Sequence, residues 1–142
     1  MRYVLDASSV LRYTDNEAGA DRIEEILRQA ARGQAEIMLT AVNWGEVANV
    51  LYRRLGPLSA RPVLQNLKSL PIAIVPVDAA IAEAAGIFKA DHKVPYADAY
   101  AGAVTLAYSS GPKKDHAVLV TADFDFKNVA SGTIQIEFLP KK

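Results

Sequence analysis

The sequence predicts an α/β fold, a three-layer α/β/α sandwich around a central, mostly parallel sheet. Short apolar runs alternate along the chain with segments of helical spacing, which is the pattern of this fold class. The first four apolar runs contain almost no polar residue, as is typical of strands that a parallel sheet buries on both faces. With 142 residues, 51% of them hydrophobic, we expect one domain covering residues 1–142.

Five short runs are expected as strands, at Tyr3–Leu5, Glu36–Thr40, Ile72–Val75, Ala117–Val120 and Thr133–Phe138. The last is expected at a sheet edge, because Gln135 and Glu137 alternate with apolar residues and would point outward. Helices are expected over Ala18–Arg32, from about residue 41 to Leu55, over Leu58–Leu70, from Asp78 to about Ala90, and from Pro95 to about Tyr108. The second is expected to be capped by Thr40 or Asn43 and to turn inward Val47, Val50, Leu51 and Leu55.

Composition excludes several classes of protein. The chain has no cysteine, so disulfides and thiolate zinc sites are excluded, and His92 and His116 are too far apart in sequence to form a ligand pair. An acid at position 6 is incompatible with the apolar core of a signal peptide, and no apolar run approaches the ~20 residues of a membrane helix. We therefore expect a cytoplasmic protein without membrane contact. The net charge of zero gives no basic footprint for duplex binding.

Four acids occupy positions where solvation alone is a poor explanation. Asp6 follows the first expected strand and Asp123 follows the fourth, and ligands of open α/β sheets bind beyond the carboxyl ends of strands. Asp98 lies in a helix that is apolar nearly all round, with no lysine or arginine at helical spacing. Glu46 lies at the border of the buried stripe of its helix.

Carboxylates that are brought together repel one another unless a cation binds or some keep their protons. Oxygen ligands without Cys or His suit Mg²⁺ or Mn²⁺. Such an ion activates water and stabilises charge on a phosphoryl oxygen, which suits phosphodiester hydrolysis. The chain has neither a P-loop nor a GxGxxG motif. Each acid also has a local explanation: Asp6 as a cap, Glu46 as a solvated residue, Asp98 as a first-turn acid and Asp123 as a turn residue.

Four segments resemble those that carry the acids of PIN-domain nucleases, and among these the VapC toxins. They are Val4-Leu5-Asp6-Ala7-Ser8, Val42-Asn43-Trp44-Gly45-Glu46-Val47, Tyr96-Ala97-Asp98-Ala99, and Leu119-Val120-Thr121-Ala122-Asp123-Phe124-Asp125-Phe126. The resemblance spans nearly the whole chain, with the acids in family order. It implies a metal-dependent endoribonuclease, usually dimeric, that acts on RNA and is blocked by a VapB-like antitoxin partner.

The expected roles follow from this resemblance together with the chemistry. Asp6, Asp98 and Asp123 are expected to hold the metal, and Glu46 to bind it or to orient the attacking water. Three further residues are expected to surround the metal ligands and to hydrogen-bond to them: Ser8, Thr121 and Asp125. Candidate RNA contacts are Asn43, Trp44, Arg53, Arg54, Lys89, Lys93, Lys113 and Lys114. The histidines are expected to be bystanders, and packing or a dimer interface is expected for Tyr13, Tyr96 and Tyr100.

Two other functions fit part of the pattern. A phosphatase of the haloacid-dehalogenase kind also places an aspartate after its first strand, but it needs a second Asp two residues on, where this chain has Ser8. A PIN-like or receiver-like interaction module would bind a partner and cleave nothing. A receiver would need adjacent acids near the first strand, and a degenerate PIN domain usually lacks some of the four acids that this chain has.

Overall fold

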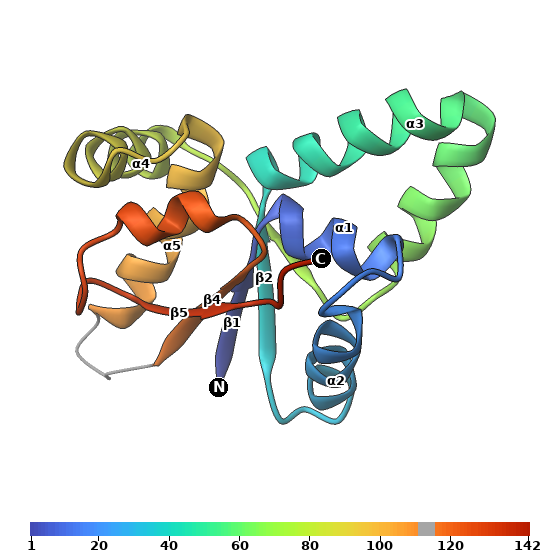
Figure 1. Cartoon of the computed structure of the whole chain (residues 1–142), viewed down its shortest axis with the longest axis horizontal. Helices are drawn as coiled ribbons and strands as arrows, with labels where there is room; N and C mark the ends of the chain where they lie inside the picture. Colours follow the sequence, from blue (N-terminus) through green and yellow to red (C-terminus); the bar gives the residue numbers. More distant parts are fainter. Residues whose placement is uncertain (111–115) are drawn as a thin grey trace.

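A single parallel sheet of five strands forms the centre of the molecule. The structure, a computed structural model, describes residues 1–110 and 116–142. The strands are β1 (Arg2–Leu5), β2 (Glu36–Thr40), β3 (Ala73–Val75), β4 (Ala117–Thr121) and β5 (Gln135–Phe138). Their order is β3-β2-β1-β4-β5, and every neighbouring pair is parallel. The predicted α/β fold is confirmed (Figure 1).

The strand order places a reversal of direction at the centre of the sheet. From β1 the chain adds β2 and β3 on one side, and later β4 and β5 on the other. β1 and β4 are therefore neighbours, with Leu5 opposite Val120 in register. In open α/β sheets such a switch point opens a crevice beyond the carboxyl ends of the strands. We call this side of the sheet the carboxyl edge.

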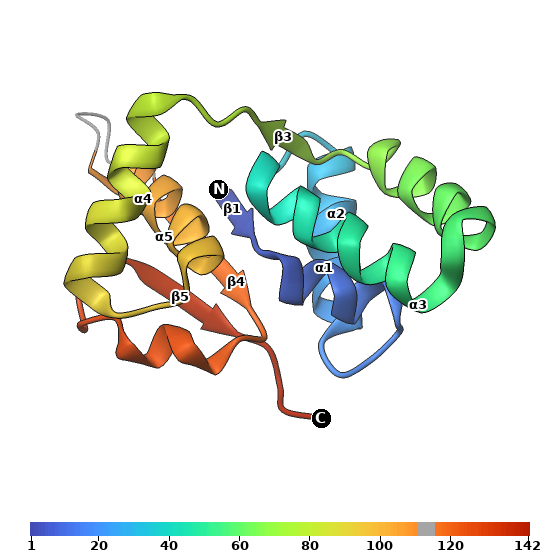
Figure 2. The same ribbon diagram turned by 90° about the horizontal axis from the view of Figure 1, so that it is seen from above.

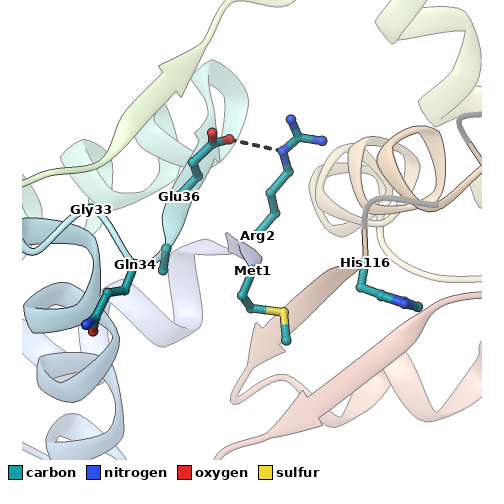
Figure 3. A pocket seen from close by; sticks show the side chains of 7 residues that line it. Met1, Arg2, Gly33, Gln34, Glu36 and His116 are labelled. Carbon is teal, nitrogen blue, oxygen red and sulfur yellow. Dashed lines mark hydrogen bonds and ion pairs between the residues drawn. The ribbon is translucent and has the colours of Figure 1, made fainter. Parts of the chain in front are cut away.

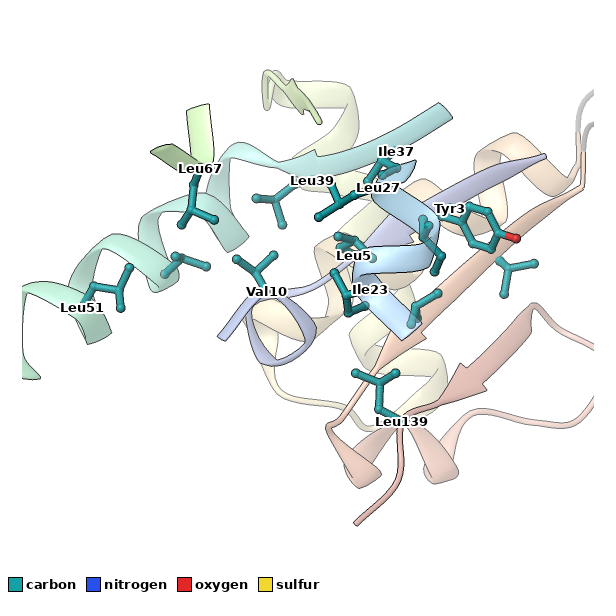
Figure 4. Packing of buried hydrophobic residues seen from close by; sticks show 14 of the residues in the cluster. Tyr3, Leu5, Val10, Ile23, Leu27, Ile37, Leu39, Leu51, Leu67 and Leu139 are labelled. Atoms are coloured by element: carbon teal, nitrogen blue, oxygen red, sulfur yellow. The ribbon is translucent and has the colours of Figure 1, made fainter. Parts of the chain in front are cut away.

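Alternation along the strands divides the core into two clusters. Leu5 and its alternating neighbours on β2 and β4 pack into one cluster with α1, α2 and α3, part of which Figure 4 shows. Val4 and the intervening residues face the other cluster, which includes Phe88 of α4 and Val104 of α5. Both faces of the sheet are thus covered, as the apolar strand runs predict.

Five α-helices and one short 3-10 helix surround the sheet in the described part of the chain. The helices are α1 (Ala7–Thr14), α2 (Ala20–Ala31), α3 (Ala41–Lys68), α4 (Ala79–His92), α5 (Tyr96–Ser109) and the 3-10 helix η1 (Phe124–Asn128). Figure 2 shows α4 and α5 on one side of β1 and α1, α2 and α3 on the other. None of these helices combines the length and apolarity needed to cross a membrane.

Helix α3 contains the break that Gly56 and Pro57 predict. Gly56 adopts a φ of 77°, a left-handed conformation that favours glycine, and the chain turns there between two helical segments. Thr40 caps the first segment by accepting a hydrogen bond from the Asn43 backbone N–H. The inward orientation expected for Leu55 is wrong, because this side chain is 45% exposed beside the break.

The edge strand β5 departs from the sequence expectation at one residue. The edge position is confirmed, and Gln135 is exposed. Glu137 does not point to open solvent, because its register partner Val120 faces the cluster that α2 covers. There Arg22 of α2 donates two hydrogen bonds to the Glu137 carboxylate, at 2.7 and 3.0 Å.

Helices α4 and α5 approach each other closely at a glycine. A Cβ atom on Gly102 of α5 would lie 2.4 Å from the Phe88 ring of α4. Glycine is therefore needed at this position for the two helices to pack as they do.

Candidate metal centre

Asp6 lies at the end of β1, buried beneath the carboxyl edge. Its side chain is 1% exposed and caps α1 by accepting a hydrogen bond from the Ser9 backbone N–H at 3.0 Å. The Ser8 hydroxyl donates to the same oxygen, Oδ1, at 2.7 Å, and the Thr121 hydroxyl donates to Oδ2 at 2.5 Å. A carboxylate can accept roughly four hydrogen bonds, two at each oxygen. Oδ1 accepts two here and Oδ2 accepts one, so Oδ2 can still accept one further partner.

Ser8 and Thr121 join the ends of β1 and β4. The Ser8 hydroxyl accepts a hydrogen bond from the Ala122 backbone N–H, and the Thr121 hydroxyl accepts one from the Asp123 backbone N–H, both at 2.9 Å. Each hydroxyl therefore accepts from the backbone after β4 while it donates to Asp6. This arrangement fixes the position of Asp123 relative to Asp6.

Asp98, Asp123 and Asp125 bring their carboxylates together above Asp6. One oxygen from each lies within 4.8 Å of the other two, a spacing that suits shared coordination of one ion. Asp98 is only 8% exposed, and its Oδ2 has no hydrogen-bond partner. A buried carboxylate oxygen without a donor is costly, so a cation at this position would remove the cost.

The inclusion of Asp125 in this trio extends the set that the sequence suggested. From the sequence, Asp125 was expected to lie behind the ligands and not among them. Its backbone N–H does take part in a turn, donating to Asp123 Oδ1 at 2.9 Å, but its carboxylate also joins the trio. Asp123 is the N-cap of η1 and Asp125 lies in its first turn, so both acids lie at the start of this short helix.

Electrostatic repulsion and burial keep protons on this cluster when no cation is bound. Burial first, then a hydrogen bond with Asp123 and the nearby negative charges, raises the pKa of Asp98 to about 9. Burial also raises the pKa of Asp6, although the donors around that carboxyl oppose the effect. The pKa of Glu46 is raised by burial and by the charges of Asp6 and Asp123, while Asn43 opposes the effect. Asp6 and Glu46 thus lie near enough to the trio for their charges to be felt, although the close group of oxygens consists of Asp98, Asp123 and Asp125.

Glu46 is held by Asn43, which lies one turn earlier on α3. The Asn43 side chain donates to Glu46 Oε1 at 2.9 Å and to the Ala97 carbonyl of α5 at 3.2 Å. The Thr40 hydroxyl donates to Asn43 Oδ1 at 2.7 Å and so fixes the amide orientation. Asn43 is 0% exposed, so the expectation that it contacts RNA is wrong; it links the helices that carry Glu46 and Asp98.

The donor set fits a hard divalent cation. Every candidate ligand is a carboxylate oxygen, and none of the described residues adds a histidine or a thiolate to the cluster. Asp98 Oδ2 is the buried side-chain atom of the described residues that lacks a partner, and it lies in this cluster. Mg²⁺ or Mn²⁺ would coordinate that oxygen and would also offset the negative charge of the cluster.

Most of the other RNA candidates lie on the surface. Arg53 and Lys93 are exposed, and Arg54 pairs with Asp15 at 2.8 Å. Lys89 donates to the Val94 carbonyl. Trp44 is half-buried against the core cluster of the first face, which favours a packing role. Lys113 and Lys114 lie outside the described residues.

The remaining aromatic residues and the histidines are separate from the acid cluster. Tyr13 is half-buried against the core. Tyr100 is buried, and its hydroxyl donates a hydrogen bond to the hydroxyl of the exposed Tyr96 at 3.1 Å. The His92 ring packs on Phe88 with centroids 4.5 Å apart. Within the described residues, none of these side chains hydrogen-bonds to an acid of the cluster.

The cavities around the molecule differ in their relation to the acids. Figure 3 shows one of about 440 Å³, lined by residues that include Met1, Glu36 and His116. Met1 and Glu36 lie at the starts of β1 and β2, so this cavity is at the opposite edge from the acids. A second cavity of about 660 Å³ includes Asp125 in its lining and adjoins the cluster.

Solved structures share this fold over nearly the full chain. A chain of the VapBC2 complex of Rickettsia felis, bound to a DNA fragment from its promoter, is 14% identical, with 99% of this chain and 100% of that chain covered and a TM-score of 0.72. A chain of the DNA-bound VapBC of Salmonella typhimurium is 15% identical, with coverages of 97% and 98% and a TM-score of 0.69. The sarcin–ricin-loop-cleaving toxin VapC20 of Mycobacterium tuberculosis is 20% identical, with coverages of 94% and 98% and a TM-score of 0.64.

Identities at this level establish the shared fold. None of the curated protein sequences matches the chain. The sequence model of the PIN domain, however, matches residues 3–132, which includes every acid of the cluster. The chain belongs to the PIN domain family.

Proposed function

We propose that this protein is a metal-dependent endoribonuclease that hydrolyses RNA phosphodiester bonds with Mg²⁺ or Mn²⁺. The observation that carries the proposal is the buried, unpartnered Oδ2 of Asp98 within the carboxylate cluster at the carboxyl edge. Structural ion pairs do not account for the cluster, because no lysine or arginine of the described residues pairs with Asp98 or Asp123. The four acids sit where α/β folds place their reactive groups.

We assign metal binding to some residues of the cluster and proton transfer to another. Asp98 and Asp123 would hold the cation directly, with Asp6 and Asp125 completing its surroundings directly or through water. A bound cation would supply positive charge that stabilises the pentacoordinate phosphorus formed on attack and would make water more acidic. Glu46 is half-buried and accepts a hydrogen bond from Asn43, and in this proposal it would orient the attacking water and accept its proton.

The biological setting that we propose is a toxin–antitoxin pair of the VapBC type. The PIN family match and the likeness to VapBC and VapC structures support this setting. We propose that the chain forms one nuclease domain over residues 1–142, acts in the cytoplasm as a homodimer and is inhibited by a VapB-like antitoxin. A small neighbouring reading frame that encodes a DNA-binding partner would support the pairing.

The geometry around Asp6 argues against a phosphatase that uses this residue as its nucleophile. Asp6 is buried at 1% exposure, and three hydrogen-bond donors occupy its carboxylate. A nucleophilic carboxylate must reach the phosphorus atom of its substrate. Ser8, at the position of the second phosphatase aspartate, instead holds Asp6.

Cleavage of RNA by matched variants tests the proposal. Wild-type protein should cleave RNA with Mg²⁺, lose activity in EDTA and recover it with Mn²⁺. Asp98→Asn should lower cleavage by at least about a hundredfold while the variant stays folded. Asp91→Asn, which removes an exposed acid at the end of α4, is the control and should retain activity.

Any of three results would overturn the proposal. Full cleavage by Asp98→Asn would show that the cluster is not the reaction centre. Failure of the wild type to bind Mn²⁺ in calorimetry would instead favour the interaction module, and turnover of p-nitrophenyl phosphate without RNA cleavage would favour the phosphatase.

A further inference from the structure

An aromatic pair lies directly beside the acid cluster. Phe124 follows Asp123 and begins η1, and its ring stacks on Phe138 with centroids 5.5 Å apart and planes 10° from parallel. Phe138 is the last residue of β5 and lies opposite Thr121 in register. Both rings are therefore at the carboxyl edge, and both keep part of their surface exposed.

Two lysines converge on the Phe124 ring. The Lys127 Nζ lies 5.1 Å and the Lys141 Nζ 5.2 Å from the ring centroid, distances at which an aromatic ring attracts a cation. Lys127 comes from η1 and Lys141 from the segment after β5, so two separate parts of the chain supply them. Figure 1 shows these parts near one another in the red end of the chain.

Apart from their contact with the ring, these lysines have no acidic partner within the described part of the protein. Neither Lys127 nor Lys141 forms an ion pair there, whereas neighbouring Lys142 pairs with Glu17. Each ammonium group therefore lacks an acidic counter-charge, and a phosphate oxygen of a bound anion could supply one. The arrangement combines two aromatic rings with two lysines that have no acidic partner, next to the acids.

We propose that Lys127 and Lys141, gathered by the Phe124 ring, bind the phosphate backbone of the RNA strand as it passes the acid cluster. The inference rests on the proposed ribonuclease function and adds a substrate contact to it. The acid cluster repels RNA until a cation binds, so a separate cationic contact is needed to hold the strand nearby. Lys127 and Lys141 provide it through Phe124, which adjoins the candidate ligand Asp123 in sequence.

Salt dependence of binding tests this contact. The probe is a short, fluorescein-labelled 2′-O-methyl oligoribonucleotide with phosphorothioate linkages, titrated in Ca²⁺ and followed by fluorescence anisotropy. Each phosphate contact in a single strand contributes about −0.7 to the slope of log K against log salt, so Lys127→Gln and Lys141→Gln should each reduce the magnitude of the slope by about 0.7. Lys→Arg changes should keep the wild-type slope, as should Lys68→Gln at an exposed position before β3.

The role of the ring is tested separately. Phe124→Leu keeps an apolar side chain but removes the aromatic face, so the Kd should rise by about two- to fivefold, and Phe124→Tyr should restore it. Unfolding temperatures identify variants that fail to fold. A purely structural role for these residues would change stability and leave the salt slope unchanged.

The outcomes separate this inference from the proposed function. Slopes equal to that of the wild type in both lysine variants, or no binding of the oligonucleotide by the wild type, would overturn the inference. Neither result decides whether Asp98-dependent cleavage occurs, which the cleavage assay measures independently. Slopes of reduced magnitude without any metal-dependent cleavage would support the contact and contradict the proposed ribonuclease.

Discussion

Replacing Asp98 by asparagine should change how the stability of the metal-free protein depends on pH. Burial, then the hydrogen bond and charge of Asp123, raises the pKa of Asp98 from 3.8 to about 9. A group with a raised pKa in the folded state stabilises the fold fully below its unfolded pKa, and this contribution is lost as the pH rises through the folded value. For Asp98 the loss extends from about pH 4 to about pH 9.

The size of this effect depends on one proton. Within that window the folded protein holds one proton more at Asp98 than the unfolded chain, so the free energy of unfolding falls by about 1.4 kcal/mol per pH unit. Between about pH 6 and pH 8 the loss is about 2.7 kcal/mol, or roughly 8–10 °C in Tm for a chain of this size.

Urea unfolding in EDTA across this pH range measures the effect. Asp98→Asn has no proton to lose at this position, so its stability should fall less steeply, by about 1.4 kcal/mol per pH unit. Asp91→Asn removes an exposed carboxyl outside the cluster and should follow the wild type. Parallel curves for the wild type and Asp98→Asn would refute the reasoning that Asp98 retains a proton in the metal-free fold.

Three further changes test the surroundings of the site. Asn43→Ala should lower the free energy of unfolding by about 2–3 kcal/mol in urea titrations and weaken Mn²⁺ binding in calorimetry, because buried partners lose their hydrogen bonds. Gly102→Ala should cost about 1–3 kcal/mol in the same titrations, since the added methyl group overlaps Phe88, whereas Gly86→Ala, with open space around it, should be neutral or stabilising. Mn²⁺ at about 100 times its Kd should stabilise the wild type by about 2.7 kcal/mol in a thermal shift assay and leave Asp98→Asn unchanged.

The sequence predicted the layers of the fold because burial leaves a local signal. Apolar runs such as Ala117–Val120 identify strands covered on both faces, and the structure confirms them. Helix α1 was not predicted because eight residues are too few to show a clear helical periodicity. Its N-cap, Asp6, was also interpreted as a metal ligand. In the structure Asp6 Oδ1 caps α1, while Oδ2 accepts a hydrogen bond from the Thr121 hydroxyl.

The convergence of the acids could be predicted, but their hydrogen-bond partners could not. Asp6 and Asp123 were expected together because parallel strands end at one edge. The bond from Asn43 to the Ala97 carbonyl joins residues 54 positions apart, and no local pattern in the sequence specifies such a pair. The exposure of the Leu55 side chain could not be predicted for a similar reason. Its burial depends on the direction in which the chain continues after the turn at Gly56.

The positions of the two helix-borne acids follow from the parallel sheet itself. A helix that leads from one parallel strand towards the next must run back to the amino edge, so its first turns lie at the carboxyl edge. Glu46 is in the second turn of α3 and Asp98 in the first turn of α5, while Asp6 and Asp123 cap α1 and η1. Helix N-termini favour negative charge. The fold therefore gathers the carboxylates and offsets part of their repulsion, and the remaining repulsion, concentrated on the unpartnered oxygen of Asp98, is what a divalent cation would remove.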